Sequence, residues 1–380
     1  MVQHPENDGS PIQTGPLGVS LWQQLAYAHS GPLRWAAPGL LPLSWLFNGI
    51  ATSRRWLYRA GWLSSFSFPV PILSVGNLTV GGIGKTPFTI FLARQLRQMG
   101  FSPAILIRGY KRQSTEPIVL TPSSFQSPQV AAYGDEAVLL LRGTGCLIAI
   151  DGDRVGSARR VLQQTGCDCL LLDDGFQHLR LRRDLDLVLF SSQTPLGNGY
   201  TLPYGPLREP VCALNEADLL LFNGEVPATA WAPSGIPRFA GGLEWTGLQP
   251  FREWKAQPSA DPIPVAQFPS RTIMLVSGIG NPQRLEDQAR QQGCSIVAQH
   301  RFPDHQWFTL AESRRILALA KPMPIFLTEK DAVRLLPLQE LVWENYPHTY
   351  VIRAAWSMRD EAAFLEWLNI SMRRIGKKGR

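Results

Sequence analysis

A glycine-rich loop between a short apolar run and a helical pattern is the feature that most constrains this fold. Residues 71–75 read PILSV, a mostly apolar run of strand length, and residues 76–86 read GNLTVGGIGKT. Apolar side chains then recur at helical spacing over residues 88–96. Glycines allow backbone N–H groups to surround phosphates, and the start of the following helix adds its dipole. Strand, loop, Lys-Thr and helix in this order predict a phosphate-binding loop in an α/β fold.

Residues 79–86 are the expected nucleotide-binding part of this loop. Lys85 would reach the β- and γ-phosphates of a nucleotide, and the Thr86 hydroxyl would be a ligand of Mg²⁺. Thr79 departs from the usual G-x-x-x-x-G-K-[ST] pattern, which has glycine at that position. We expect Gly81 and Gly82 to supply the backbone freedom; the alternative is a chance glycine-rich turn. The full expected set is Thr79, Val80, Gly81, Gly82, Ile83, Gly84, Lys85 and Thr86.

Two acids follow a second apolar run. Residues 169–172 are apolar, and Asp173 and Asp174 come next. A strand buried on both faces of a parallel sheet has such a continuous apolar run, and ligands bind beyond the carboxyl ends of strands in open α/β sheets. The pattern therefore predicts that Asp173 and Asp174 lie beside the magnesium ion, without distinguishing which of them touches it. An acidic turn that only ends the strand is the alternative.

Further strand-like runs alternate with helical stretches along the chain. They cover residues 104–107, 147–150, 185–190 and 219–222, and later residues 272–277, 295–299, 325–328 and 349–352. Strands that alternate with helices favour a parallel, doubly wound sheet. The expected fold class is α/β: a P-loop NTPase-like, mainly parallel sheet with a smaller carboxy-terminal α/β subdomain.

The expected division of the chain follows these patterns. Residues 227–271 are rich in proline and glycine and lack a strong helical period, which is typical of a linker. Residues 373–380 are basic, and we expect them to be disordered. We predict a flexible tail at 1–18, an apolar helical segment at 19–68, a P-loop core at 69–226, a linker with a short β region at 227–271, an α/β subdomain at 272–370 and a basic tail at 371–380.

Composition narrows the class of protein. Hydrophobic residues make up 44% of the chain, but the mean hydropathy of -0.07 is far from that of a multispan membrane protein. The formal net charge of +7 suits phosphorylated small molecules or anionic lipid surfaces. Nucleic acid is not an expected partner, because no Lys/Arg block with interleaved aromatic residues occurs. The five cysteines lack the spacing of a disulfide framework, which favours a reducing cytosol.

The amino-terminal apolar segment points to a membrane surface. Residues 35–53 carry no charged side chain, and this length is close to the ~20 residues that span a bilayer as a helix. Pro38 and Pro42 interrupt the stretch, so we expect no clean transmembrane helix. Basic and aromatic residues alternate over residues 54–62, a mixture that favours the membrane interface. A helix that simply packs on the core is the alternative.

Several separate motifs occur in the order seen in the tetraacyldisaccharide 4'-kinase (lipid A 4'-kinase) family, which the chain resembles over most of its length. They lie at residues 74–87, 108–110, 134–136, 173–178, 206–210, 277–279, 302–305 and 328–331. The resemblance implies an enzyme that uses ATP and Mg²⁺ to phosphorylate the 4'-hydroxyl of a tetraacyldisaccharide 1-phosphate, a lipid A precursor. It also implies a peripheral or singly anchored enzyme on the cytosolic face of the bacterial inner membrane.

The resemblance also implies catalytic roles that the residues alone leave open. Asp135 precedes an apolar helical run and by itself is read as a helix N-cap, but the resemblance implies the catalytic base. His305 by itself is read as a residue at the surface or the edge of the core. The resemblance implies instead that His305 pairs with Asp135 and orients its carboxylate. Gln306 departs from the family pattern, which often has a second histidine there.

The loop at residues 206–210 carries two further candidates between prolines. Two prolines stiffen such a loop for structural reasons alone, but the resemblance implies that Glu209 lies near Mg²⁺ and that Arg208 contacts substrate. Arg108, with Lys111 and Arg112, is expected to hold the 1-phosphate of the substrate, although exposed basic residues are often only solvated. The expected metal-binding set is thus Thr86, Asp173, Asp174 and Glu209.

Two other classes of protein compete with a kinase. A P-loop GTPase would need Asn-Lys-x-Asp after a strand, and the nearest candidate, residues 328–331, reads TEKD and fails that spacing. A nucleotide-gated membrane adaptor would have no phosphoryl acceptor. Both alternatives leave the motifs around Arg208 and His305 without a use, so the kinase is the preferred hypothesis.

Overall fold

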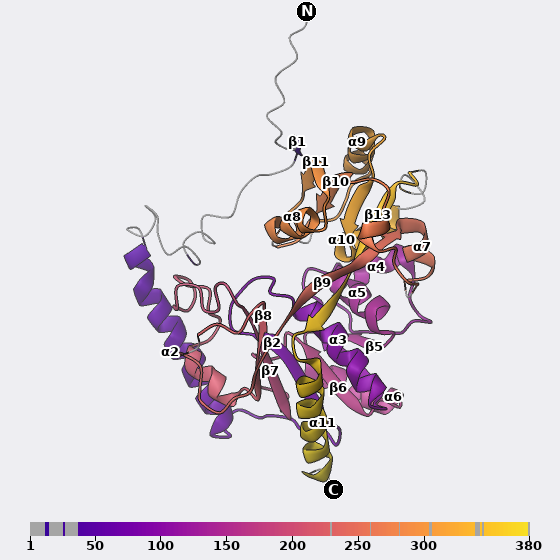
Figure 1. Ribbon diagram of the computed structural model, residues 1–380. Coiled ribbons are helices and arrows are strands. Elements are labelled where there is room, and N and C mark those ends of the chain that lie inside the picture. Colours follow the sequence, from indigo (N-terminus) through magenta and orange to yellow (C-terminus); the bar gives the residue numbers. More distant parts are fainter. Residues whose placement is uncertain are drawn as a thin grey trace, which may run out of the picture.

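The computed structural model describes residues 12–14, 26, 37–228, 230–258, 260–280, 282–303, 306–338, 343 and 346–378. Within these residues one sheet of 13 strands runs through the whole molecule, in the order β1-β11-β10-β12-β13-β9-β8-β7-β2-β6-β3-β5-β4 (Figure 1). The strands are β1 (Ile12–Thr14), β2 (Ile72–Asn77), β3 (Pro103–Ile107), β4 (Ile118–Leu120), β5 (Leu147–Ile150), β6 (Cys169–Asp173), β7 (Leu185–Ser191), β8 (Leu219–Asn223), β9 (Arg238–Pro250), β10 (Thr272–Ser277), β11 (Ser295–Arg301), β12 (Ile325–Thr328) and β13 (Thr349–Met358).

Helices cover both faces of this sheet. Side chains alternate between the faces of a strand, so Leu73 and Ile105 pack with α3 and α5, whereas Ile72 and Ala104 pack with α6 on the other face. This is the doubly wound α/β architecture that the sequence predicts. The helices are α2 (Leu41–Arg59), α3 (Lys85–Gln98), α4 (Val130–Tyr133), α5 (Asp135–Thr144), α6 (Arg154–Gln164), α7 (Phe251–Ala256), α8 (Pro282–Gln291), α9 (Leu310–Ala320), α10 (Glu329–Leu335) and α11 (Glu361–Lys378).

The P-loop half of the sheet is built from buried parallel strands. Strands β8, β7, β2, β6, β3 and β5 pair in parallel, and only the short edge strand β4 runs antiparallel. Every residue of β2, β3, β6 and β8 is buried. Continuous apolar runs without alternation are therefore the correct signal for these strands, and the predicted mainly parallel sheet is confirmed.

A long strand joins this half to the carboxy-terminal half, which contains strands β13, β12, β10 and β11. Strand β9 has 13 residues and pairs in parallel with β8 on one side and antiparallel with β13 on the other. It lies in residues 227–271, where the sequence suggested a linker with only a short β region. Its three glycines and its mixed polar residues conceal the strand from an analysis of apolar runs. The sheet continues from one half to the other, so it does not mark the predicted domain boundaries. These boundaries remain predictions.

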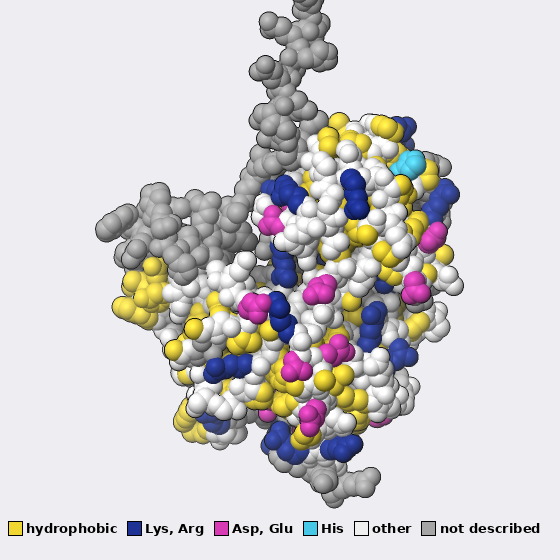
Figure 2. Space-filling model, in the orientation of Figure 1, with side chains coloured by type: hydrophobic (Ala, Val, Ile, Leu, Met, Phe, Trp, Pro, Cys, Tyr) yellow, Lys and Arg dark blue, Asp and Glu magenta, His cyan; other side chains and the backbone are white. Residues whose placement is uncertain are grey.

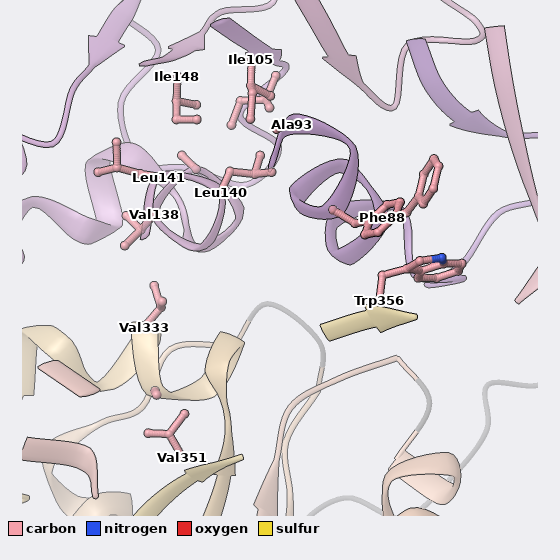
Figure 3. Packing of buried hydrophobic residues seen from close by; sticks show 14 of the residues in the cluster. Phe88, Ala93, Ile105, Val138, Leu140, Leu141, Ile148, Val333, Val351 and Trp356 are labelled. Carbon is pink, nitrogen blue, oxygen red and sulfur yellow. The ribbon is translucent and has the colours of Figure 1, made fainter. Parts of the chain in front are cut away.

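The two halves also share one hydrophobic core. Phe88 of α3 lies against Trp356 of β13, with ring centroids 5.4 Å apart, and Val138 of α5 faces Val333 of α10 (Figure 3). Burial of large side chains at such a junction contributes about 1.5–3 kcal/mol for each side chain. The packing therefore holds α5 and α10, which carry candidate site residues, in a fixed relation.

Helix α11 extends further than expected, whereas α2 lies within the predicted helical segment 19–68. Helix α11 extends to Lys378, so the basic residues expected in a disordered tail continue a helix up to that point. Helix α2 projects at one edge of the molecule, where Figure 1 shows it apart from the sheet. Among the described residues, we find no helix with the length and apolar character needed to cross a bilayer.

Candidate active site

The phosphate-binding loop has the predicted connection between β2 and α3. Gly84 immediately precedes α3 with a φ of 94°, and Gly81 has a φ of 115°, both in the left-handed region. Thr79 forms an antiparallel bridge with Leu207. The backbone freedom of the loop thus comes from Gly81 and Gly84, and a residue with a side chain is accommodated at position 79 because its backbone is strand-like.

The loop at residues 206–210 is bound directly to this phosphate-binding loop. The amide of Val80 donates to the Pro206 carbonyl at 2.8 Å, and the amide of Arg208 donates to the Leu78 carbonyl at 2.8 Å. These hydrogen bonds bring two segments that are distant in sequence together as one rigid unit. Arg208 therefore arrives at the nucleotide site, where its guanidinium contacts Asp174.

Lys85 is held by two polar partners at the start of α3. Its Nζ donates to Asn77 Oδ1 at 3.0 Å and lies 3.5 Å from Asp174 Oδ1. Arg208 Nη2 donates to the same Asn77 oxygen at 2.9 Å. The side chain of Asn77 therefore sets the spacing between the two cations.

The neighbouring acids Asp173 and Asp174 lie in different environments. Asp173 is buried and accepts hydrogen bonds from the Thr86 hydroxyl at 3.2 Å and the Thr89 hydroxyl at 3.0 Å. Burial raises the pKa of Asp173, and Lys85 only partly offsets this. Burial also acts on Asp174, but there Lys85 and Arg208 prevail and hold the pKa at about 2. Asp174 is thus an ionised partner for cations, and Asp173 is the acid that faces Thr86.

The Thr86 and Asp173 side chains suit a magnesium ion. Both supply oxygen donors, which Mg²⁺ prefers, and P-loop enzymes hold this ion between such a hydroxyl, a strand-end acid and the phosphates. In the described part of the chain, no group of three or more His, Cys, Asp or Glu side chains forms a metal cage.

Glu209 lies on the far side of its loop from these acids. Its buried carboxylate forms an ion pair with Arg55 of α2 at 2.6 Å, and Arg55 also pairs with Glu216. The Arg55 guanidinium lies over the Phe176 ring, 4.7 Å from its centroid. The structure brings Arg208, but not Glu209, into contact with the acids at the phosphate-binding loop.

Several residues without an expected role support the site. The buried Arg154 donates to the backbone carbonyls of Asp173 at 3.0 Å and Asp174 at 3.2 Å, and Asn223 donates to the Ile83 carbonyl at 2.9 Å. Asp174 itself has a φ of 56°, in the left-handed region that Asp tolerates better than most residues. The sequence positions of these residues could have identified them, because Asn77 and Asn223 end β2 and β8 and Arg154 follows β5 closely.

Asp135 is the first residue of α5 and is buried at the junction of the two halves. Gly134 is the N-cap residue, so the interpretation of Asp135 as the N-cap is wrong. Its Oδ2 accepts from Arg334 Nε at 2.8 Å and from Arg334 Nη2 at 2.6 Å, and Lys330 Nζ lies 3.9 Å away. His305, its expected partner, lies outside the described residues.

Arg108 directly follows β3 and is exposed at the same edge of the sheet as the acids. Strands β3 and β6 are paired in parallel with Leu106 opposite Leu172, so Arg108 and Asp174 leave the sheet side by side. Exposure at this edge leaves the guanidinium accessible to an anionic ligand.

Comparison with known proteins gives consistent matches over nearly the whole chain. The family described as Tetraacyldisaccharide-1-P 4'-kinase matches residues 36–373. A Tetraacyldisaccharide 4'-kinase of Stenotrophomonas maltophilia is 37% identical over 311 residues, which cover 81% of this chain and 86% of that protein. One from Alkalilimnicola ehrlichii is 39% identical over 305 residues, with 80% and 85% covered. The crystal structure of LpxK from Aquifex aeolicus in complex with ATP superposes with a TM-score of 0.71 at 26% identity, covering 89% of this chain and 99% of that one.

Proposed function

The chain belongs to the tetraacyldisaccharide-1-P 4'-kinase family, and from this premise we propose how its residues carry out the reaction. It is an ATP-dependent kinase that transfers the γ-phosphate of ATP to the 4'-hydroxyl of tetraacyldisaccharide 1-phosphate, a step of lipid A biosynthesis. The single observation that carries the chemical proposal is the cluster at the carboxyl ends of β2 and β6, where Lys85 contacts Asn77 and Asp174 and Thr86 contacts Asp173.

The phosphate-binding loop would hold ATP with its γ-phosphate at Lys85. Lys85 stays in place because Asn77 and the ionised Asp174 bind its ammonium group. Its positive charge is therefore in position to bind a phosphate. Thr86 and Asp173 would hold Mg²⁺, which supplies neutralisation of phosphate charge. Arg208 would direct a second positive charge to the same phosphates, because it shares Asn77 and Asp174 with Lys85.

Asp135 would serve as the base for the acceptor hydroxyl. In the transfer, the 4'-oxygen forms a bond to the γ-phosphorus while the bond from that phosphorus to the β–γ bridging oxygen breaks, and ADP leaves. The hydroxyl proton passes to the Asp135 carboxylate. The buried position of Asp135 at the junction of the halves supports this role, because a buried base is screened from water. That His305 orients this carboxylate remains a prediction.

Arg108 would hold the 1-phosphate of the lipid substrate. It is exposed at the edge of the sheet where substrate must approach, and Lys111 and Arg112 follow it in the same loop. A guanidinium binds a phosphate through two parallel hydrogen bonds. The contacts of Arg208, by comparison, favour a place nearer the nucleotide than the 1-phosphate.

The outer face of α2 would lie in the cytosolic surface of the membrane. Hydrophobic side chains gather along this edge of the molecule (Figure 2), and Trp45, Leu46 and Ile50 are each more than half exposed. With Leu57 and Leu63 they line a groove of about 510 Å³. Exposed apolar surface of this kind marks an interaction site, and a substrate with four acyl chains is itself a component of a membrane.

The reaction is tested by transfer of labelled γ-phosphate from ATP to tetraacyldisaccharide 1-phosphate in detergent micelles. We expect transfer by the wild type, and a loss of at least about 1000-fold in kcat for Lys85→Ala and Asp135→Ala, since each removes a group that acts mainly in the transition state. A conservative exposed variant, Arg314→Lys on α9, serves as the control. Undiminished transfer by Asp135→Ala would exclude its role as the base while leaving the kinase activity in place.

A further inference from the structure

The corner between β12 and α10 carries two charged residues that are fully buried. Asp331 has 0% and Arg334 has 1% of its surface exposed. They belong to or adjoin the motif at residues 328–331, which has no role in the mechanism described above. Buried charges are costly unless they are paired and hydrogen-bonded. The partners of these two residues therefore indicate why the charges are placed there.

Arg334 connects three elements through one guanidinium. Its Nη1 donates to the Gly278 carbonyl at the end of β10 at 2.7 Å and lies 3.3 Å from Asp331 Oδ1. Its Nε and Nη2 both donate to Asp135 Oδ2, at 2.8 Å and 2.6 Å. One edge of the guanidinium is thus held by its own half of the molecule, and the other edge binds the carboxylate on α5.

Asp331 fixes the position of Arg334 through its own hydrogen bonds. Its Oδ1 accepts from the Gly278 amide at 3.0 Å, and its Oδ2 accepts from the Thr328 hydroxyl at 2.6 Å. A Cβ atom on Gly278 would come within 2.9 Å of Arg334 Nη1, so glycine is the residue that permits this close approach. Backbone and side chain together leave the guanidinium little freedom to turn away from Asp135.

Other charged residues also lie near Asp135. Glu136 follows it on the same helix, and its amide donates to Asp135 Oδ1 at 2.9 Å. Among the described residues, α10 contributes two cations close to it, Lys330 and Arg334. Asp331, on the same helix, pairs with Arg334 rather than with Asp135.

We propose that Arg334, held by Asp331 and Gly278, is the positioning residue for Asp135 in phosphoryl transfer. The inference rests on the proposed role of Asp135 as the base. Two hydrogen bonds to Oδ2 restrict rotation of the carboxylate about its bond to Cβ, and the adjacent positive charge favours the ionised form, which is the form that accepts a proton. Because Arg334 belongs to the carboxy-terminal half, the base is set in place only where the two halves pack together.

The test compares Arg334→Gln with Arg334→Lys, with Val333→Ala as a control and Asp135→Asn as a reference. Gln removes the charge and keeps a donor, and Lys keeps the charge. Val333→Ala removes buried apolar packing between α10 and α5 but no hydrogen bond to Asp135. For each variant the measurements are the thermal unfolding midpoint, kcat and KM for both substrates, and the pH profile of kcat.

For Arg334→Gln we expect kcat to fall about 100-fold, the effect of a displacement of roughly 1 Å at a reacting group, with little change in either KM. The acidic limb of the kcat profile should move up by at least about 1 pH unit, because an adjacent guanidinium favours the ionised carboxylate by about that much or more. Arg334→Lys should keep the acidic limb near its wild-type position and recover part of kcat. Val333→Ala should lower the unfolding midpoint and leave the limb unmoved.

Three outcomes would overturn the proposal or its premise. If Arg334→Gln loses stability and activity as Val333→Ala does, with the acidic limb unmoved, Arg334 only supports the fold. If the limb moves equally in Arg334→Gln and Arg334→Lys, charge at this position does not act on the base. Near wild-type transfer by Asp135→Asn would instead refute the role of Asp135 itself, independently of Arg334.

Discussion

At the scale of single residues, the site depends on two adjacent acids, Asp173 and Asp174, whose environments shift their pKa values in opposite directions. Asp173 is buried against two threonine hydroxyls, whereas Asp174 turns into a left-handed conformation and meets Lys85 and Arg208. Burial raises the pKa of the first acid, and the two cations lower that of the second to about 2. Its contact with Thr86 places Asp173 where a metal ion would bind, and the lowered pKa of Asp174 suits it to holding cations at the phosphates.

This difference predicts which acid the metal needs. We expect Asp173→Asn to weaken the tightening of ATP binding by Mg²⁺ about 10- to 100-fold, the usual cost of removing a group that supports a metal. Asp174→Asn should retain the Mg²⁺ effect, although it lowers kcat because Lys85 loses an ionised partner. Calorimetric titration of ATP into each variant, with and without Mg²⁺, makes the comparison. Equal loss of the Mg²⁺ effect in both variants would show that the metal does not distinguish them.

At the scale of elements, one face of α2 packs against the rest of the protein and the other face is exposed. Its inner face carries Arg55, which binds Glu209 and Glu216 and lies over Phe176. Glu209 belongs to the same short loop as Arg208, so the helix is anchored one residue away from a group that contacts Asp174. The contacts of Glu209 favour the anchoring of α2 as its role over the expected binding of Mg²⁺.

The outer face of α2 predicts binding to a membrane. We expect the double variant Trp45→Ser/Leu46→Ser to bind vesicles of phosphatidylcholine and phosphatidylglycerol more than about tenfold more weakly than the wild type, because insertion of each large apolar side chain contributes about 1.5–3 kcal/mol. Ile370→Ser is the matched control, since Ile370 is 60% exposed but lies on α11. Flotation of the protein with vesicles measures the effect. A similar loss in both variants would argue against a specific role for α2.

At the scale of the whole molecule, the sequence predicts whatever depends on local pattern. Buried parallel strands give continuous apolar runs, and the phosphate-binding loop and the acids after β6 occupy fixed positions relative to those strands. Strand β9 escapes such an analysis because it is rich in glycine and because its pairing with β13 depends on residues about 100 positions away. The pairs Asp135–Arg334 and Glu209–Arg55 are likewise long-range contacts, which no local pattern records.

The continuity of the sheet predicts that both halves unfold together. Strands β8, β9 and β13 join the halves without a break, and Phe88 and Trp356 pack across the junction (Figure 3). We therefore expect peptides from β6 and from β12 to lose protection from hydrogen exchange at the same urea concentration. Trp356→Ala should lower the stability of both by about 3–5 kcal/mol, the cost of deleting a buried aromatic side chain. Exchange in β12 at a lower urea concentration than in β6 would instead show that the α/β subdomain predicted at residues 272–370 unfolds independently.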